Sequence, residues 1–289
     1  MLTVYVETLW LGENEGGEAR PMREQEYVHG YSTREGERLA DQAATVERLL
    51  HHDTIYPPGS RVLEAGCGIG AQTSILCHNH PRALFTSIDR SAESLDAARQ
   101  RAQGEGVTNV TFQQADIFDL PFPEASFDHV FVCFVLEHLA DPVAALRCLM
   151  RVLRPGGSLT AIEGDHGSTF FHPRSEKAWR TIQCQIDLQA RAGGDSLIGR
   201  RLYPLLTEAG LRQVSVSPRQ VYADPSLPHL VDGFTRKTFI AMIEGIRGKA
   251  IEAGLIGERD WEEGLADLRR TAEEDGAFCY TFFKGVGIR

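Results

Sequence analysis

The sequence predicts an α/β protein with a seven-stranded, mostly parallel sheet, helices on both faces of that sheet, and a helical cap. Three observations carry this prediction. Between Tyr56 and about Ser168, short β-like runs alternate with helical runs, and this order gives a parallel sheet with right-handed crossovers. The run Asp128–Phe134 (DHVFVCF) is apolar on both faces, as a buried parallel strand should be. Finally, 289 residues suffice for one large domain with a cap.

The expected strands are short runs enriched in apolar residues, and the helices between them begin and end at recognisable residues. In chain order the strands are Arg61–Glu64, Ala83–Asp89, Val110–Gln113, Asp128–Phe134, Ser158–Glu163, Gln213–Val221 and Phe278–Val286. A helix is expected over Ala71–Asn79, and another from a Ser91 cap to Gln103. A third begins at Asp141-Pro142, because a cap followed by proline is typical of a helix start.

Two segments lie outside this alternation. Residues 24–56 are expected to form a helical segment before the core, since Leu39, Ala43, Val46, Leu49 and Leu50 make one apolar stripe; its role as a cover for a cofactor is implied only by the family resemblance given below. Residues 226–275 are mostly helical, and they are far more than a connection between neighbouring strands needs. The expected division is therefore an N-terminal arm (1–23), the covering segment (24–56), a core (57–225 and 276–289) and an insert (226–275) that serves as cap, dimer surface or both.

Composition excludes several classes of protein. Acidic residues outnumber basic ones 40 to 30, and no basic run occurs, so binding to nucleic acid or an anionic membrane is not expected. No stretch approaches the roughly 18 apolar residues that span a bilayer. No Lys or Arg precedes Arg20, and the six cysteines are scattered, which favours a cytoplasmic protein with reduced thiols.

The chemistry-bearing residues fall at one edge of the predicted sheet. In open α/β sheets, ligands bind beyond the carboxyl ends of the strands. That rule directs attention to Glu64–Gly70, Asp89, Asp116, Phe134–His138 and Glu163–His166.

The loop Glu64-Ala-Gly-Cys-Gly-Ile-Gly70 follows the first strand. Its glycines let the backbone turn sharply and approach a ligand closely, and the helix after it directs N–H groups at that ligand. Dinucleotide enzymes also use glycine-rich loops, but here the spacing is G-x-G-x-G, and Glu64 would repel a pyrophosphate. A ligand with an ammonium group and a single carboxylate suits this loop better.

Two acidic residues follow the next strands. Asp89 can accept hydrogen bonds from both hydroxyls of a ribose. Asp116 could accept from an exocyclic amino group, and Ile117 could pack on a purine face. Each acid, taken alone, is equally well explained as a helix cap or a solvated loop residue.

These motifs, taken in order, resemble those of the class I S-adenosylmethionine-dependent methyltransferases, a family with a Rossmann-like fold. The resemblance spans roughly Pro57 to Ser168 and rests on Val62–Gly70 (VLEAGCGIG), Ser87–Asp89, Gln114–Leu120 (QADIFDL), Phe127–His138 (FDHVFVCFVLEH) and Leu153–Gly157 (LRPGG). It implies that the cofactor is S-adenosylmethionine and that the group transferred is a methyl group.

The resemblance also implies a role for each matching residue. Glu64, Gly66, Gly68 and Gly70 would surround the methionine end, Asp89 the ribose, Asp116 and Ile117 the adenine, and Phe134 the sulfonium, with Tyr27 and Tyr31 covering the methyl donor. Thr73 and Arg90 complete the expected cofactor-binding set.

Base candidates occur after the fourth and fifth strands. His138 forms a Glu-His pair that is widespread in this superfamily and could be structural. Asp165 and His166 lie in Glu163–His166, where three titratable groups within four residues favour a role in proton transfer or substrate binding. With Tyr27 they form the expected catalytic set. His51-His52 and His78-x-His80 lack a ligand set at zinc spacing, so no metal is expected.

The acceptor is expected to be a small molecule. EGDHG after the fifth strand, YVHGYS at Tyr27–Ser32 and the late insert resemble natural-product methyltransferases, among which indole C-methylation is favoured. Aromatic residues available for a flat pocket are Phe170, Phe171, Trp179, Tyr222, Phe234, Phe239 and Phe282. O- or N-methylation, a non-catalytic S-adenosylmethionine-binding protein and a nicotinamide oxidoreductase are the alternatives, and a homodimer is a further expectation.

Overall fold

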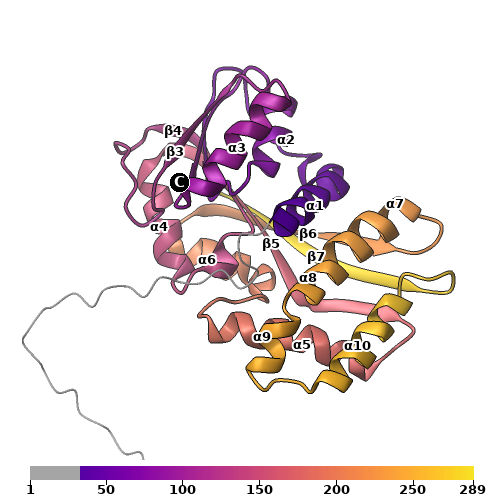
Figure 1. Cartoon of the computed structure of the whole chain (residues 1–289). Coiled ribbons are helices and arrows are strands. Elements are labelled where there is room, and N and C mark those ends of the chain that lie inside the picture. The colour runs from indigo at the N-terminus through magenta and orange to yellow at the C-terminus, as the bar shows by residue number, and fades with distance from the viewer. Residues whose placement is uncertain (1–32) are drawn as a thin grey trace, which may run out of the picture.

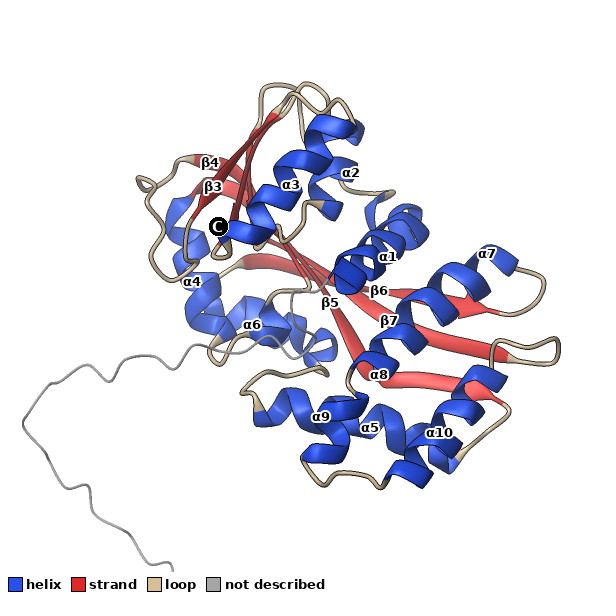
Figure 2. Cartoon of the chain, in the orientation of Figure 1, coloured by secondary structure: helices blue, strands red, loops and turns tan. Residues whose placement is uncertain are grey.

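The computed structural model describes residues 33–289, and within them seven strands form one sheet in the order β3-β2-β1-β4-β5-β7-β6 (Figure 2). All neighbouring pairs are parallel except those that β7 makes with β5 and β6. The strands are β1 (Arg61–Ala65), β2 (Leu84–Asp89), β3 (Val110–Gln114), β4 (Phe127–Cys133), β5 (Leu153–His172), β6 (Arg212–Ala223) and β7 (Ala277–Ile288). This confirms the predicted mostly parallel, Rossmann-like sheet.

Helices cover both faces of the sheet, and each face carries its own apolar core. One core includes Leu50 and Leu76, and the other includes Leu146, Leu149 and Leu206. The helices are α1 (Thr33–His51), α2 (Ala71–Asn79), α3 (Ala92–Gly104), α4 (Pro142–Val152), α5 (Glu176–Arg191), α6 (Leu202–Ala209), α7 (Pro228–Leu230), α8 (Ala241–Gly245), α9 (Arg247–Glu252) and α10 (Glu258–Arg270), with 3₁₀ turns at Leu136–His138 and Ile198–Arg201 and a π-helix, η3, over Val231–Ile240.

The helix starts follow the capping chemistry of the sequence. The Ser91 hydroxyl accepts a hydrogen bond from the Ser94 N–H (3.1 Å), and the Asp141 carboxylate accepts one from the Ala144 N–H (2.8 Å). These bonds satisfy donors that a helix leaves unpaired at its first turn. The caps expected at Ser91 and Asp141 are confirmed.

The fifth strand differs most from expectation. It was predicted to end at Glu163, but β5 continues to His172 because Gly164–His172 pairs with the beginning of β7. A register shift between Asp165 and Phe170 accommodates this extension. Figure 1 shows β5, β7 and β6 reaching beyond the other strands, with α8 and α10 beside them. Asp165 and His166 therefore lie within a strand and not in a loop after it.

The helices between β6 and β7 pack on these long strands. Trp261, Phe234, Phe239 and Phe278 are all at most 2% exposed, so this part of the chain belongs to the main core. The π-helix also lies against α1. A Cβ atom placed on Gly233 would come within 2.3 Å of the Thr45 hydroxyl oxygen, so glycine is what allows this close approach.

A buried ammonium group fixes the end of α1 to the sheet. Lys284 of β7 donates to the Asp53 carboxylate (2.6 Å), the Thr54 hydroxyl (2.6 Å) and the Leu50 carbonyl (3.1 Å). Arg219 of β6 binds the other Asp53 oxygen. Burial disfavours the charged form, but the hydrogen bonds from Lys284 and Arg219 lower the pKa of Asp53 to about 2. The cluster therefore keeps α1 in place above the sheet.

Lys284→Met should destabilise the protein by about 2–3 kcal/mol, because it leaves three oxygens without a buried cationic donor. Urea unfolding at neutral pH measures this loss. The matched control is Lys177→Met, since Lys177 is half exposed and its solvent-screened ion pair with Glu263 should contribute little to stability. Equal effects from the two substitutions would contradict the proposed role of the cluster.

Candidate active site

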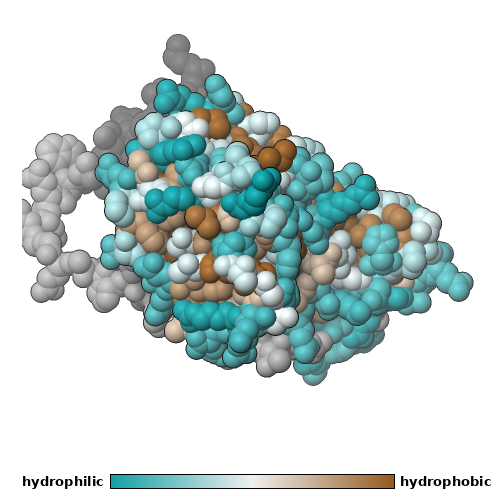
Figure 3. Space-filling model, turned by 90° about the horizontal axis from the view of Figure 1, so that it is seen from above, coloured by the Kyte–Doolittle hydropathy of each residue, from teal (hydrophilic) through white to brown (hydrophobic). Residues whose placement is uncertain are grey.

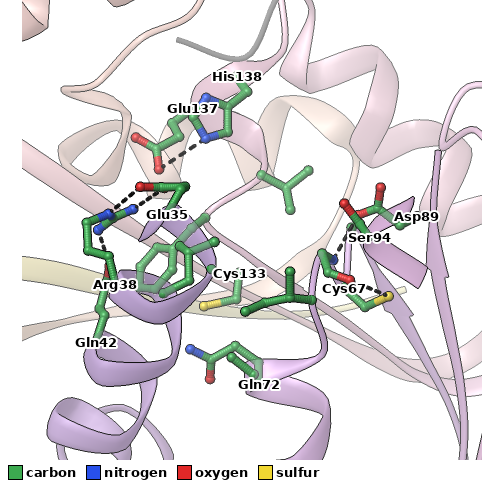
Figure 4. A pocket seen from close by; sticks show the side chains of 18 of the residues that line it. Glu35, Arg38, Gln42, Cys67, Gln72, Asp89, Ser94, Cys133, Glu137 and His138 are labelled. Atoms are coloured by element: carbon green, nitrogen blue, oxygen red, sulfur yellow. Dashed lines mark hydrogen bonds and ion pairs between the residues drawn. The ribbon is translucent and has the colours of Figure 1, made fainter. Parts of the chain in front are cut away.

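A large cavity lies at the carboxyl ends of β1, β2 and β4 and continues beneath α1 and the π-helix. Its volume is about 990 Å³. Pockets for one drug-sized ligand occupy about 300–1,000 Å³, so this cavity lies at the upper end of that range. Figure 4 shows side chains that face it from α1, from the glycine-rich loop and from the turn after β4.

The glycine-rich loop forms one wall of this cavity. Gly66, Gly68 and Gly70 have φ values of 74°, 51° and 77°, which side-chain-bearing residues rarely adopt. The Gly66 and Cys67 N–H groups donate to the Ile88 carbonyl at 2.8 and 2.9 Å and tie the loop to β2. Gly66 and Gly68 line the cavity, whereas Gly70 packs against Ala98 of α3 and does not.

Glu64 is a buried carboxylate that also lines the cavity. One of its oxygens accepts hydrogen bonds from the hydroxyls of Thr73 and Ser87, both at 2.6 Å. Burial raises the pKa of Glu64 to about 7 in spite of these two donors. Thr73 was expected to touch the cofactor, but it lies outside the lining because its hydroxyl is used to hold Glu64.

The ends of β2 and β3 supply the next part of the wall, with Asp89, Arg90, Asp116 and Ile117 all at the cavity. The Asp89 carboxylate accepts hydrogen bonds from the Gly68 N–H (2.8 Å) and the Ser91 N–H (2.9 Å). Asp116 accepts one from the Phe118 N–H (2.8 Å) and is exposed, whereas Ile117 is buried. Carboxylate and apolar side chains thus alternate along this edge.

The Glu163 carboxylate stabilises the turn after β4 by accepting hydrogen bonds from its backbone. One Glu163 oxygen accepts hydrogen bonds from the Val135 and Leu136 N–H groups at 3.1 and 2.8 Å. Burial raises the pKa of Glu163 well above its ordinary value. Phe134, at the start of the turn, has a φ of 57° and packs against Phe282 with 5.3 Å between ring centroids. This left-handed backbone conformation lies at the end of β4, where Phe134 lines the cavity.

The half beneath the π-helix is mainly apolar and aromatic. Of the aromatic residues proposed from sequence, Phe234, Phe239 and Phe282 line it, and Phe170, Phe171, Trp179 and Tyr222 do not. Phe170 and Tyr222 are instead exposed on the protruding part of the sheet. The remaining apolar or aromatic walls come from Met242 and Tyr280, which sequence reasoning missed.

Two histidines face the cavity. His138 lies 3.7 Å from the Glu137 carboxylate through its Nε2 atom, and burial lowers its pKa. His166 is 6% exposed, its Nδ1 atom lies 2.8 Å from the Tyr280 hydroxyl, and burial lowers its pKa as well. Both rings are therefore neutral near pH 7.

Asp165 does not join them. Both of its oxygens bind the Arg200 guanidinium at 2.7 Å, and one also accepts a hydrogen bond from the Gly167 N–H. Asp165 is buried and lies outside the cavity lining. The structure therefore pairs Asp165 with Arg200 and does not bring it to the cavity with the two histidines. The other expected residues, Tyr27 and Tyr31, lie outside the described residues.

Helix α1 contributes a polar wall that the sequence did not predict. Arg38 forms a double hydrogen bond with Glu35 (2.6 and 2.8 Å) and another with Gln42 (3.0 Å), and all three side chains are buried (Figure 4). Their i, i+3 and i, i+4 spacing was a readable signal, since such pairs face each other on a helix.

Comparison with known proteins identifies this site. A methyltransferase domain model matches residues 63–161, which contain the glycine-rich loop, Asp89, Asp116 and Phe134. This segment of the chain therefore forms a methyltransferase domain, in agreement with the resemblance to the class I S-adenosylmethionine-dependent methyltransferases. It is 33% identical over 214 residues to an uncharacterized 37.1 kDa protein of transposon TN4556 from Streptomyces fradiae, covering 71% of this chain and 61% of that protein. It is 28% identical over 256 residues to the 27-O-demethylrifamycin SV methyltransferase of Amycolatopsis mediterranei, covering 85% and 84% of the two chains.

Solved methyltransferase structures share the fold. Phosphoethanolamine N-methyltransferase 2 of Haemonchus contortus, in complex with phosphomonomethylethanolamine and S-adenosylhomocysteine, has a TM-score of 0.55 at 16% identity, covering 86% of this chain and 53% of that one. Among the curated relatives at 33 to 42% identity, this methyltransferase chain spans 24 to 61% of their own lengths.

Other features of the described residues define what surrounds the methyltransferase site. No group of three or more His, Cys, Asp or Glu side chains among residues 33–289 is placed to hold a metal ion. No helix in the same part of the chain is long and apolar enough to cross a membrane. On the face seen in Figure 3, hydrophilic residues predominate and apolar ones occur in small, separate groups.

Proposed function

We propose that the protein transfers a methyl group from S-adenosylmethionine to a small, mostly apolar acceptor molecule. The observation that carries this proposal is that one cavity is lined by two chemically different sets of residues. The lining from the ends of β1, β2 and β3, here called the donor half, has carboxylates and tight glycine turns, and the lining from the π-helix, α8 and β7, here called the aromatic half, has mainly aromatic and apolar side chains.

The donor half fits S-adenosylmethionine through the residues present. Glu64 is a buried carboxylate with a raised pKa, so a cationic ammonium group beside it would relieve an unfavourable burial. Asp89 would accept from ribose hydroxyls, Asp116 and Ile117 would hold the adenine, and Arg90 lies at the same wall. Gly66 and Gly68 would let the methionine portion approach the backbone. Gly70 and Thr73 act indirectly, by shaping the loop and holding Glu64.

When bound, S-adenosylmethionine supplies an activated methyl group: the acceptor atom bonds to the methyl carbon, and the electrons of the breaking carbon–sulfur bond neutralise the sulfonium. The protein must align the reactants, which can contribute on the order of 7–11 kcal/mol. Phe134 lies where an aromatic ring could stabilise the cation by roughly 0.5–2 kcal/mol. α1 and the π-helix exclude water from above.

A proton on the acceptor atom needs a base, and we assign this role to His138. It lines the cavity and is neutral near pH 7, so its ring can accept a proton, and Glu137 would stabilise the resulting charge. Tyr27 would cover the donor, and His166 would assist at the acceptor.

Within this class we favour an aromatic or heteroaromatic natural product as the acceptor, with an indole carbon as the first candidate. The four-part division of the chain and the homodimer also remain proposals.

The test is an incubation of the protein with isotopically labelled S-adenosylmethionine and a bacterial metabolite extract, followed by mass spectrometry. We expect one labelled small molecule that is absent when His138→Ala replaces the wild type. Binding of S-adenosylhomocysteine without any labelled product would instead indicate a non-catalytic S-adenosylmethionine-binding protein.

A further inference from the structure

In the aromatic half of the cavity, His166 and Tyr280 form a hydrogen bond, and the surroundings indicate which of the two residues is the donor. His166 and Tyr280 both line the cavity, and the His166 Nδ1 atom lies 2.8 Å from the Tyr280 hydroxyl oxygen. The His166 Nε2 atom is shielded from solvent and has no hydrogen-bond partner among residues 33–289. Phe239 and Tyr280 pack beside the imidazole, with ring centroids 6.0 and 5.7 Å away.

The Tyr280 hydroxyl determines which nitrogen of His166 carries the proton. Tyr280 is 3% exposed, and its hydroxyl contacts His166 Nδ1. Burial raises the pKa of Tyr280 well above its ordinary value, so the phenol keeps its proton. The acceptor available to that proton within residues 33–289 is His166 Nδ1. The reverse arrangement would leave both the buried phenolic proton and the Nε2 lone pair unpaired, whereas this one leaves only the Nε2–H without a partner among residues 33–289, so it costs less free energy.

The backbone is shaped to allow this contact. A Cβ atom on Gly164 would lie 2.2 Å from the Tyr280 hydroxyl oxygen, so any larger residue would displace the hydroxyl. Because a neutral imidazole has one N–H group, donation by Tyr280 to Nδ1 places the proton on Nε2. Tyr280 thus acts as a positioning residue for His166.

We propose that His166 presents an Nε2–H donor to the acceptor molecule, and that this molecule carries an oxygen lone pair, as a ketone, carboxylate or phenolate does. This proposal rests on the proposed function, since it names the substrate class of the same site. It also divides the work between the histidines, because His138 removes a proton and His166 binds and polarises an oxygen. Aromatic and apolar side chains around this donor favour a flat molecule with its oxygen at one edge.

The tautomer is tested first, without any acceptor. In ¹⁵N-labelled wild-type protein, NMR correlation of the His166 ring should show a protonated Nε2 and an unprotonated Nδ1. Tyr280→Phe should produce a mixture of tautomers, a change that a merely structural role of the hydroxyl would not cause. A protonated Nδ1 in the wild type would overturn the proposal.

Binding of three bicyclic probes of similar shape provides the second test. 1-Indanone has a carbonyl oxygen, indole has only an N–H donor, and indane has neither. NMR titration of the protein saturated with S-adenosylhomocysteine should show 1-indanone binding roughly threefold to tenfold more tightly than indane, the worth of one hydrogen bond. Indole should bind no more tightly than indane, and His166→Leu should remove the preference.

A preference for indole, a preference that survives in His166→Leu, or no binding of any probe to the saturated protein would each overturn the proposal. Failure to bind S-adenosylhomocysteine would instead overturn the proposed function, while the tautomer measurement would still decide the assignment of His166.

Discussion

Asp89→Asn should weaken binding of S-adenosylhomocysteine at least tenfold. In the wild type each Asp89 oxygen accepts one backbone hydrogen bond, from Gly68 and from Ser91. Each oxygen can accept a second bond, which leaves the carboxylate able to bind two ribose hydroxyls. The asparagine amide replaces one charged acceptor by an NH₂ donor, and hydrogen bonds to charged groups are worth about 1.5–3 kcal/mol. That range corresponds to roughly 10–100-fold in affinity.

Isothermal titration calorimetry measures this loss directly. Asp96→Asn is the matched control, because Asp96 lies on the exposed side of α3 and pairs only with Arg99 in the described structure. It should leave the dissociation constant within about twofold. A change below twofold for Asp89→Asn would show that the ribose lies elsewhere, and the donor half would have to be reassigned.

The elements that local chemistry determines could be predicted from the sequence. The α2 bounds, Ala71–Asn79, match the prediction, because the glycine loop before the helix and His80 after it mark its ends. The caps at Ser91 and Asp141 were predictable for the same reason. The cavity-lining residues Glu64, Asp89, Asp116 and Phe134 follow from another simple rule, that the carboxyl ends of parallel strands meet at one edge.

The features that the sequence could not provide depend on contacts between distant parts of the chain. The extension of β5 past Glu163 requires pairing with Ala277–Phe282, more than a hundred positions away. Tyr280 faces the cavity for the same reason. Arg200 forms an ion pair with Asp165 although the two residues are 35 positions apart in the sequence, and no local pattern around Asp165 indicates this partner. The surroundings of a titratable group, which decide its role, are set by the tertiary structure.

Glu64→Gln should stabilise the free protein at pH 8. The pKa of Glu64 rises from its ordinary 4.5 to about 7 because of burial. A carboxyl group whose pKa is higher in the folded state stabilises fully below its unfolded pKa, and this contribution is lost as pH rises through the folded pKa. The wild type should therefore lose up to about 3 kcal/mol between pH 4.5 and 8 from this group. Glutamine keeps an oxygen for the Thr73 and Ser87 hydroxyls but cannot ionise.

Urea unfolding of the two proteins across this pH range should show the difference growing as pH rises. Glu93→Gln, at an exposed position on the same cavity, should leave the pH profile of the wild type unchanged. A constant difference between Glu64→Gln and wild type at all pH values would contradict the assignment, because only an ionising group can make it grow.

The same substitution should have the opposite effect on binding. An ammonium group beside Glu64 favours the ionised carboxylate, so binding of S-adenosylhomocysteine to the wild type should release protons between about pH 5 and 7 and tighten as pH rises. Glu64→Gln should abolish that release, which calorimetry in buffers of different ionisation enthalpy detects, and should weaken binding at pH 8 by at least about tenfold. A variant that is more stable when free and weaker in binding is what a charge retained for function predicts. A variant that gains stability and binds as well as the wild type would mean that Glu64 only shapes the loop.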